Sequence, residues 1–157
     1  MSRIKMLVMD VDGTMTDGHI YLGPSGEMMK AFNCKDGFGI GRLLPKMGII
    51  PVIISSRVSA VTEMRAKEMH IEELHQGVWE KRKCLEEIAA RHGFAREEIA
   101  FIGDDLNDWD CLTWCGLTAC PQDAVKQVKD VVHYVCPHEG GRGAVRDLIE
   151  YIASMEE

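Results

Sequence analysis

The sequence predicts an α/β fold: a Rossmann-like parallel sheet with helices on both faces, a small β-hairpin flap and no cap domain. Short apolar runs alternate along the chain with segments of helical periodicity. Residues 49–54 are apolar throughout, which is typical of a parallel strand buried on both faces. Acidic or hydroxyl residues follow directly after several of them. Because ligands of such sheets bind at the carboxyl ends of the strands, these polar residues are the candidate site.

Most of the expected strands are short runs rich in Val, Ile, Leu or Met. The expected strands of the sheet cover residues 4–9, 49–54, 73–75, 99–102, 117–119 and 131–134. Two further extended segments, 20–22 and 28–32, flank the turn residues Gly23, Pro24, Ser25 and Gly26 and predict a hairpin.

Helical patterns fill the intervals between the strands. They cover residues 39–47, a segment running to about residue 69, residues 80–92, residues 106–114 and the C-terminus. Gly48 and Gly93 follow two of them as C-terminal stops. In the second helix, the spacing of Val58, Val61 and Met64 predicts the buried face. The buried stripes of the third and last helices are expected at Cys84, Leu85, Ile88 and Ala89, and at Val145, Leu148, Ile149 and Ile152.

The length of 157 residues and the apolar share of 46% are those of one ordinary globular domain over residues 1–157. The formal charge of −7 and the lack of a basic run argue against nucleic acid as a partner. The longest apolar runs are far too short to span a bilayer. Asp10 interrupts the N-terminal segment before a secretory signal could form. We therefore expect a cytoplasmic protein with no membrane partner.

The six cysteines are expected to be reduced thiols, since no secretory signal precedes them. Cys111, Cys115 and Cys120 suggest a zinc site, but no second Cys or His pair follows at the usual spacing. We expect these three side chains to pack in the core as small apolar groups.

The segment MDVDGTMTDG, residues 9–18, carries the strongest chemical signal. A turn directly after a strand places the carboxylates of Asp10 and Asp12 on the same side. Asp10 can attack phosphorus, and Asp12 can protonate the leaving oxygen and later deprotonate water. Carboxylates this close repel each other, so a divalent cation is expected to keep Asp10 ionised. Gly13 lets the backbone approach a phosphate, although the aspartates could instead simply cap the turn.

This segment resembles the first motif of the haloacid dehalogenase superfamily, and the other three motifs of that superfamily have counterparts farther along the chain. The second motif is a hydroxyl residue that ends an apolar strand, and Ser55 follows residues 52–54 in this way. Its hydroxyl would donate to a phosphoryl oxygen. The alternative is that Ser55 caps the N-terminus of a helix.

The third motif is a lysine, for which Lys81 is the candidate. It precedes Cys84, Leu85 and Ile88 by three, four and seven residues, so it points along the apolar stripe of its helix. A lysine that faces inward needs an anionic partner, which a phosphate and the aspartates supply. The alternative is a lysine in the first helical turn whose ammonium group reaches solvent.

The fourth motif is GDDLND, residues 103–108, at the end of an expected strand. The resemblance implies that Asp104 binds magnesium together with Asp10 and the carbonyl of Asp12, and hard oxygen donors suit that ion. Asp105 and Asp108 would be auxiliary groups beside the metal. The alternative is an acidic helix start, which favours the helix dipole.

The resemblance is closest to the family of 3-deoxy-D-manno-octulosonate 8-phosphate phosphatases. It rests on DVDGTMTDG, GEMMKAF, KDGFGI, SSRVSAVTEMR, HQGVWEK, GDDLNDW, GLTACPQDA and GGRGAVRDLI. The chain departs from that family in Ser56, where glycine is usual, and in Thr14, where valine is common. The resemblance implies hydrolysis of a phosphorylated sugar acid, with Mg2+ as cofactor, through an aspartyl-phosphate at Asp10.

The motifs lie too close together for a cap domain. Roughly forty residues separate Asp12 from Ser55, whereas a separate domain needs at least ~50. The resemblance implies a homotetramer in which a neighbouring subunit covers the site. The hairpin around Lys30 and Phe32 would be an assembly element, and residues 140–146 would be a mobile closure that carries Arg142. A flexible turn before the last helix is the alternative for that segment.

Arg57 and Arg65 are candidate ligands for the carboxylate of the sugar acid, because the guanidinium fork matches a carboxylate. They are eight residues apart, so on one helix they would share a similar face. The alternative is a pair of surface arginines, with Arg65 bound to Glu68 or Glu72.

Other functions compete with this interpretation. A dehalogenase would not need Asp12, and a phospho-acceptor receiver domain would carry its acceptor Asp where this chain has Ser55. A phosphatase for a nine-carbon sugar-acid 9-phosphate and a non-catalytic tetrameric scaffold, related to cytidylyltransferase-fused domains, stay open. The joint presence of Asp10, Asp12, Lys81 and Asp104 favours an active enzyme.

Overall fold

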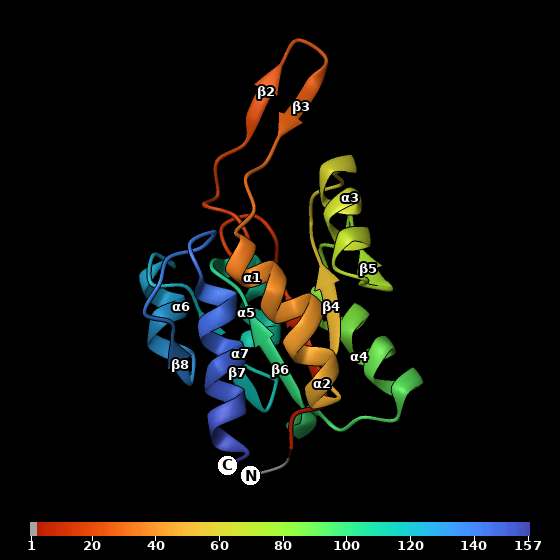
Figure 1. Cartoon of the computed structure of the whole chain (residues 1–157), viewed down its shortest axis with the longest axis vertical. Coiled ribbons are helices and arrows are strands. Elements are labelled where there is room, and N and C mark those ends of the chain that lie inside the picture. Colours follow the sequence, from red (N-terminus) through yellow and green to blue (C-terminus); the bar gives the residue numbers. More distant parts are fainter. Residues whose placement is uncertain (1–2) are drawn as a thin grey trace.

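The computed structural model describes residues 3–157 and contains a six-stranded sheet in the order β5-β4-β1-β6-β7-β8 (Figure 1). The strands are β1 (Met6–Met9), β4 (Ile50–Ile54), β5 (Glu73–His75), β6 (Ile99–Ile102), β7 (Leu117–Cys120) and β8 (Tyr134–Val135). All neighbouring strands of this sheet run parallel. The predicted α/β class is confirmed, and no cap domain is inserted between the strands of residues 3–157.

Helices cover both faces of the sheet. The helical segments are α1 (Cys34–Phe38), the π-helical η1 (Gly39–Leu43), α2 (Leu44–Met47), α3 (Ala60–Glu68), α4 (Lys81–His92), α5 (Trp109–Leu112), α6 (Lys126–Val131) and α7 (Ala144–Met155), with short 3-10 turns η2 (Arg96–Glu98) and η3 (Leu106–Asp108). On one face, η1, α2 and α7 pack on Leu7 and Met9. On the other face, α4, α5 and α6 pack on Met6 and Val8. The central strand β1 is therefore buried from both sides, as its uniformly apolar sequence predicts.

The register of the central strands places the candidate site at one edge. Met9 at the end of β1 pairs with Ile53 in β4 and with Ile102 in β6. The three strands therefore end at nearly the same level. The residues that follow them, including Asp10 and Ser55, meet at the carboxyl edge of the sheet.

The predicted hairpin is present, with β2 (Tyr21–Gly23) paired antiparallel to β3 (Gly26–Met29). It projects away from the sheet and its helices (Figure 1). Apolar side chains of both its strands are exposed, namely Tyr21, Leu22, Met28 and Met29. An isolated two-stranded hairpin is only marginally stable in water, so contacts at its base matter for its position.

Two boundaries differ from the sequence prediction. The helix expected over 39–47 begins already at Cys34, because Oδ1 of Asn33 accepts the backbone N–H groups of Lys35 and Asp36 (2.8 and 3.3 Å) and caps it there. The strand expected over 131–134 is displaced. Val131 ends helix α6, and only Tyr134–Val135 pair with β7.

The predicted buried face of α3 is wrong. Val58 precedes the helix and Met64 lies on it, and both are exposed (73% and 67%). The buried side chains of α3 are instead Thr62 and Ala66. Ser59 caps the helix by accepting the Thr62 N–H, which fixes where the helix begins and which residues turn inward. The apolar spacing in the sequence does not record that starting point.

The cysteines behave as expected of core residues. Cys111, Cys115 and Cys120 are buried among apolar side chains, and all six cysteines are unpaired. Within residues 3–157, the one group of side chains arranged to hold a metal consists of aspartates. The same part of the chain has no helix that is both long and apolar enough to cross a membrane.

Asp36 joins α1 to the start of α7. Its Oδ1 accepts the backbone N–H of Arg146 (2.9 Å), while its buried Oδ2 has no hydrogen-bond partner within the described residues. Burial raises the pKa of Asp36 to about 6, with Asp147 adding to the effect. A charged Asp36 therefore destabilises the native state at neutral pH.

The variant Asp36→Asn keeps the acceptor for Arg146 and removes the buried charge. Since the native pKa lies above the unfolded value of 3.8, wild-type stability falls as the pH rises through the window up to about 6. We expect the variant to gain up to about 3 kcal/mol relative to wild type across this window. Urea unfolding of both proteins at about pH 4, 5 and 7 measures the difference. A difference that is the same at every pH would contradict this account.

Candidate active site

A buried lysine and three aspartates meet at the carboxyl edge of the sheet. Nζ of Lys81, the first residue of α4, lies 2.9 Å from Oδ1 of Asp10 and 2.7 Å from Oδ1 of Asp108. Carboxylate oxygens of Asp10, Asp104 and Asp108 all lie within 4.8 Å of one another. The ammonium group of Lys81 points inward and is 1% exposed, as the position of this residue on the apolar stripe predicts.

The local backbone holds these groups in place. Asp10 follows β1 and its N–H donates to the carbonyl of Ile102 in β6 (3.1 Å). Oδ2 of Asp108 accepts the N–H of Asp104 (3.1 Å), so the loop after β6 closes on itself. Gly103 must be glycine because a Cβ there would overlap the Asp108 carboxylate.

Gly13 must also be glycine, both for its backbone conformation and for the space around it. Its φ is +87°, a conformation that favours glycine, and a Cβ there would overlap the carboxylate of Asp104. The backbone of the first motif thus lies directly against the acidic group of the fourth motif.

The carboxylates are crowded beyond what one lysine can neutralise. Burial and the neighbouring Asp10 raise the pKa of Asp104 to about 9, and burial raises the pKa of Asp108 to about 7. Burial alone would lower the pKa of Lys81, but Asp10 and Asp108 outweigh it and raise the value. Excess buried negative charge on hard oxygen donors is the setting that a divalent cation such as magnesium stabilises.

Both carboxylate oxygens of Asp108 already accept hydrogen bonds within this cluster. One of its oxygens binds Lys81 and the other binds the N–H of Asp104. The side chains with oxygen atoms left for a cation are therefore those of Asp10 and Asp104. The donor set fits the predicted magnesium site, and Asp108 is suited to orient its neighbours.

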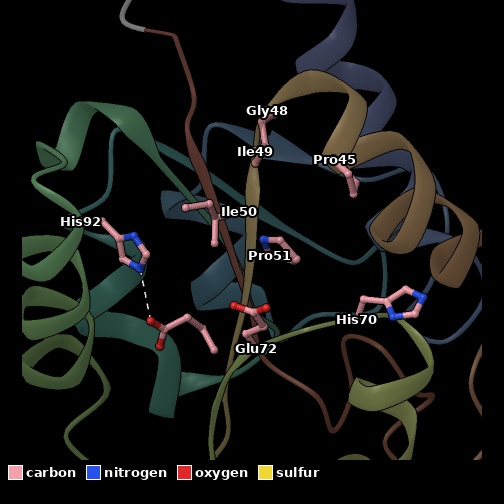
Figure 2. A pocket seen from close by; sticks show the side chains of 9 residues that line it. Pro45, Gly48, Ile49, Ile50, Pro51, His70, Glu72 and His92 are labelled. Atoms are coloured by element: carbon pink, nitrogen blue, oxygen red, sulfur yellow. Dashed lines mark hydrogen bonds and ion pairs between the residues drawn. The ribbon is translucent and has the colours of Figure 1, made fainter.

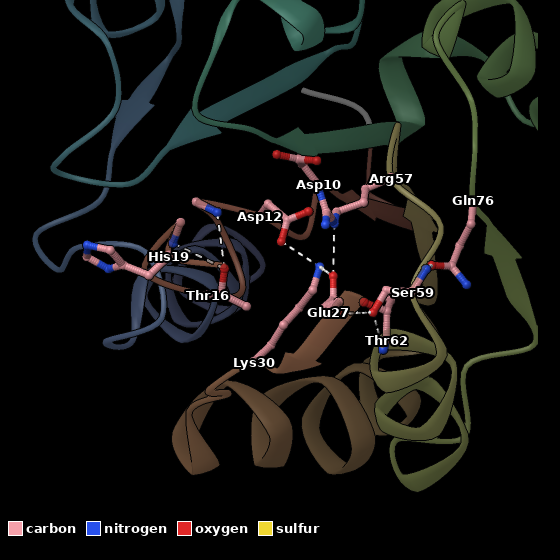
Figure 3. A network of polar contacts seen from close by, with 12 residues as sticks. Asp10, Asp12, Thr16, His19, Glu27, Lys30, Arg57, Ser59, Thr62 and Gln76 are labelled. Carbon is pink, nitrogen blue, oxygen red and sulfur yellow. Dashed lines mark hydrogen bonds and ion pairs between the residues drawn. The ribbon is translucent and has the colours of Figure 1, made fainter. Parts of the chain in front are cut away.

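Asp12 lies at the rim of the cluster and is half-buried. Its Oδ1 accepts a hydrogen bond from Nζ of Lys30 at 2.6 Å (Figure 3). Lys30 follows strand β3 and is 1% exposed at its side chain, with Glu27 3.6 Å away. Lys30 thus lies in the site, whereas the sequence assigned it to assembly. The available signal was a single lysine within the apolar stretch MMKAF, which predicts a buried cation that needs a partner.

Ser55 is buried at the end of β4, next to the cluster. Its backbone is fixed on both sides, since its N–H donates to His75 (2.8 Å) and its carbonyl accepts from Val78 (3.0 Å). The alternative role for Ser55, as a helix cap, is wrong because Ser59 caps α3. Asp105 lies outside the cluster and caps η3 by accepting the Leu106 N–H (2.7 Å).

The predicted sugar-acid arginines are not arranged as expected. Arg57 precedes α3, so it does not share a helix with Arg65. Nε of Arg57 donates to Glu27 (2.9 Å), which also accepts from the hydroxyl of Ser59. Arg65 donates to Glu68 (3.0 Å), one of the partners proposed for it as a surface residue.

The segment before α7 packs on the first motif. A Cβ on Gly140 would overlap the carbonyl of Gly13, and Gly141 donates to the carbonyl of Thr14 (3.2 Å). Arg142 next to them is exposed and reaches toward Glu139 (3.9 Å). Its part in a mobile closure stays a prediction.

A separate cavity of about 530 Å³ lies at the opposite edge of the sheet, beside the start of β4 (Figure 2). Its lining includes Ile49, Pro51, Glu72 and His92, with His92 bound to Glu73 (3.2 Å). Ligands of parallel α/β sheets bind at the carboxyl edge, so this cavity is not the predicted site.

Two threonines in the first motif are both buried but differ in their partners. Oγ1 of Thr16 accepts the N–H groups of Gly13 and Gly18, each at 3.2 Å, and so holds the turn. Oγ1 of Thr14 has no hydrogen-bond partner within residues 3–157.

Comparison with protein families gives a match over residues 52–149 to the haloacid dehalogenase-like hydrolases. A 3-deoxy-D-manno-octulosonate 8-phosphate phosphatase of Yersinia pestis is 41% identical over 156 residues, which cover 99% of this chain and 83% of the relative.

Solved structures agree with that match. The corresponding phosphatase of Moraxella catarrhalis, in complex with magnesium, phosphate and KDO, has a TM-score of 0.93 and 36% identity, covering 97% of this chain and 87% of the other. A cobalt-bound form from Haemophilus influenzae has a TM-score of 0.93 and 32% identity, covering 97% and 88%.

The two threonines give a matched test of the turn. Thr14→Val removes a hydroxyl that makes no hydrogen bond, so we expect the free energy of unfolding to change by less than about 0.5 kcal/mol or to rise. Thr16→Val leaves the buried N–H of Gly13 unpaired and should cost about 1–3 kcal/mol. Urea unfolding measures both values. Equal losses in the two variants would show that the Thr14 hydroxyl has a partner.

Proposed function

Because the chain belongs to the haloacid dehalogenase-like hydrolase family, we propose that it is a magnesium-dependent phosphomonoesterase that hydrolyses 3-deoxy-D-manno-octulosonate 8-phosphate to the free sugar acid and phosphate. The observation that supports this function most strongly is the cluster in which Lys81 binds Asp10 beside Asp104. The named activities of the relatives supply the substrate.

The reaction begins at Asp10. One of its oxygens forms a bond to phosphorus while the bond from phosphorus to the sugar oxygen breaks, and Asp12 gives its proton to that departing oxygen. Water then attacks phosphorus in the aspartyl-phosphate. Asp12 takes the proton from the water, and the bond between phosphorus and Asp10 breaks to release phosphate.

The remaining residues hold the phosphoryl group and offset its charge. Lys81 fixes Oδ1 of Asp10 and places positive charge beside the reacting phosphorus. The hydroxyl of Ser55 and the backbone at Gly13 donate to phosphoryl oxygens. Charge stabilisation of this kind provides much of the rate enhancement in phosphoryl transfer.

Magnesium would be held by the carboxylates of Asp10 and Asp104 and by the carbonyl of Asp12, with Asp105 and Asp108 as auxiliary groups. When bound, it supplies positive charge that offsets these carboxylates and the phosphoryl oxygens. Both oxygens of Asp108 are engaged by Lys81 and by the N–H of Asp104, which suits it to orient those two residues.

Recognition of the sugar acid would fall to Arg57, with Arg65 and Arg142 as further candidates. Arg57 lies at the rim of the site and is bound to Glu27. Its guanidinium group has further N–H donors that can face a substrate carboxylate. The side chain of Arg142 is exposed, and its ion pair with Glu139 (3.9 Å) is longer than the ion pairs of Arg57 and Arg65.

We further propose a homotetramer in the cytoplasm. The exposed apolar side chains of the hairpin are suited to bind other copies of the chain, and a neighbour would then cover a site that has no cap domain. The unpaired state of all six cysteines suits a reducing compartment.

Phosphate release from 3-deoxy-D-manno-octulosonate 8-phosphate, beside nine-carbon sugar-acid phosphates and common sugar phosphates, tests the activity. We expect fast turnover with magnesium, loss with a chelator, and preference for the eight-carbon acid. Asp10→Asn, the matched control, should lower kcat by more than about 10³-fold without unfolding the protein. Preference for a nine-carbon acid would overturn the substrate, and no release from any phosphate would favour the non-catalytic scaffold.

The assembly is tested by the molar mass in solution, measured by light scattering after gel filtration. Wild type should have four times the mass of one chain. Introducing charge on the hairpin with Leu22→Glu and Met28→Glu should reduce that mass, since buried charges oppose association. The same change at Val131, an exposed apolar residue of α6, serves as the control and should leave the mass unchanged. A monomeric wild type would refute the proposal.

A further inference from the structure

The ammonium group of Lys30 is buried and bound at the rim of the site. The Lys30 side chain is 1% exposed, and its Nζ lies 2.6 Å from Oδ1 of Asp12 and 3.6 Å from Oε2 of Glu27. Burying an ammonium group is costly unless it is paired and hydrogen-bonded. The short contact with Asp12 is therefore an ordered feature of the site and not a chance approach of a surface side chain.

Because of this contact, the two oxygens of Asp12 have different surroundings. Oδ1 is held by Lys30, whereas Oδ2 receives no hydrogen bond from the residues that the structure describes. A carboxyl group that delivers a proton must present one oxygen to the leaving group in a fixed direction. Lys30 restrains the rotation of the carboxylate and leaves Oδ2 free for that purpose.

Glu27 anchors Lys30 to the rest of the protein. Its carboxylate accepts from Nε of Arg57 (2.9 Å) and from the hydroxyl of Ser59, the residue that caps α3 (Figure 3). Burial works against the charge on Glu27, but the hydrogen bonds from Ser59 and Arg57 outweigh it and lower the pKa of Glu27. Strand β3 is thus tied to the loop after β4.

We propose that Lys30 is a positioning residue for Asp12: held by Glu27, it fixes the carboxylate so that Oδ2 faces the leaving oxygen. This inference rests on the proposed phosphomonoesterase function. It gives the base of the hairpin a role in catalysis within its own chain, in addition to the role in assembly.

Two substrates whose leaving groups differ in their need for a proton can distinguish a positioning role of Lys30 from a purely structural one. An alkyl phosphate such as 3-deoxy-D-manno-octulosonate 8-phosphate needs a proton on its departing oxygen, whereas p-nitrophenolate leaves without one. The value of kcat/KM covers the steps up to phosphoryl transfer, so the later hydrolysis at Asp10 does not affect the comparison.

The experiment measures kcat/KM on both substrates for wild type and Lys30→Met, with magnesium. We expect the variant to lose about 100-fold or more on the alkyl phosphate, mainly in kcat, and less than about 10-fold on p-nitrophenyl phosphate. Lys30→Gln keeps a hydrogen-bond donor, so it should show the same pattern at smaller size and serves if Lys30→Met does not fold. Lys46→Met, which removes an exposed lysine of α2, is the matched control and should match wild type.

Three results would overturn the inference: equal losses on the two substrates, no loss on either, or a rise in KM for the alkyl phosphate with kcat unchanged. The first would mean a structural role and the last a substrate contact. If wild type itself hydrolyses neither substrate, the proposed function fails first, so the two failures are distinguishable.

Discussion

The arrangement of the site depends on the buried contact of Lys81 with Asp10 and Asp108. Removing one partner of a buried ion pair leaves an uncompensated charge, which typically costs about 3–5 kcal/mol. Here one ammonium group serves two carboxylates, and a third carboxylate, Asp104, lies beside them. The cluster is therefore short of positive charge, which is the electrostatic reason why it suits a divalent cation such as magnesium.

The rest of the sheet edge is shaped to keep this cluster close-packed. Strands β1, β4 and β6 end at one level, and glycines at positions 13 and 103 let two acidic loops touch where any side chain would collide. Helix α4 begins at Lys81, so its first turn delivers the ammonium group into the space between the loops. Rigid backbone thus does the positioning, in keeping with a reaction that relies on preorganised charge.

The hairpin adds a second support from outside the sheet. Through Glu27 and Lys30 it contacts Asp12, Arg57 and the start of α3, while its tip exposes apolar side chains. The hairpin thereby combines an exposed apolar surface, which can bind other copies of the chain, with a contact to Asp12, the proposed general acid and base. In a fold without a cap domain, this is a physical route by which assembly can influence the geometry of the site.

The sequence by itself determined the parallel sheet, the alternation of strands and helices along the chain, and the placement of Asp10, Ser55, Lys81 and Asp104 at one edge of the sheet. These features follow from strand ends and helix periodicity, which are local patterns. It did not determine the buried face of α3, the start of α1 at Asn33 or the place of Lys30. Those depend on caps and on contacts between segments distant in sequence, such as Lys30 with Asp12 and Glu27 with Ser59. Only the tertiary structure decides these features. A cap fixes where a helix begins and which of its side chains turn inward, and the direction of a hairpin depends on the residues that its side chains bind.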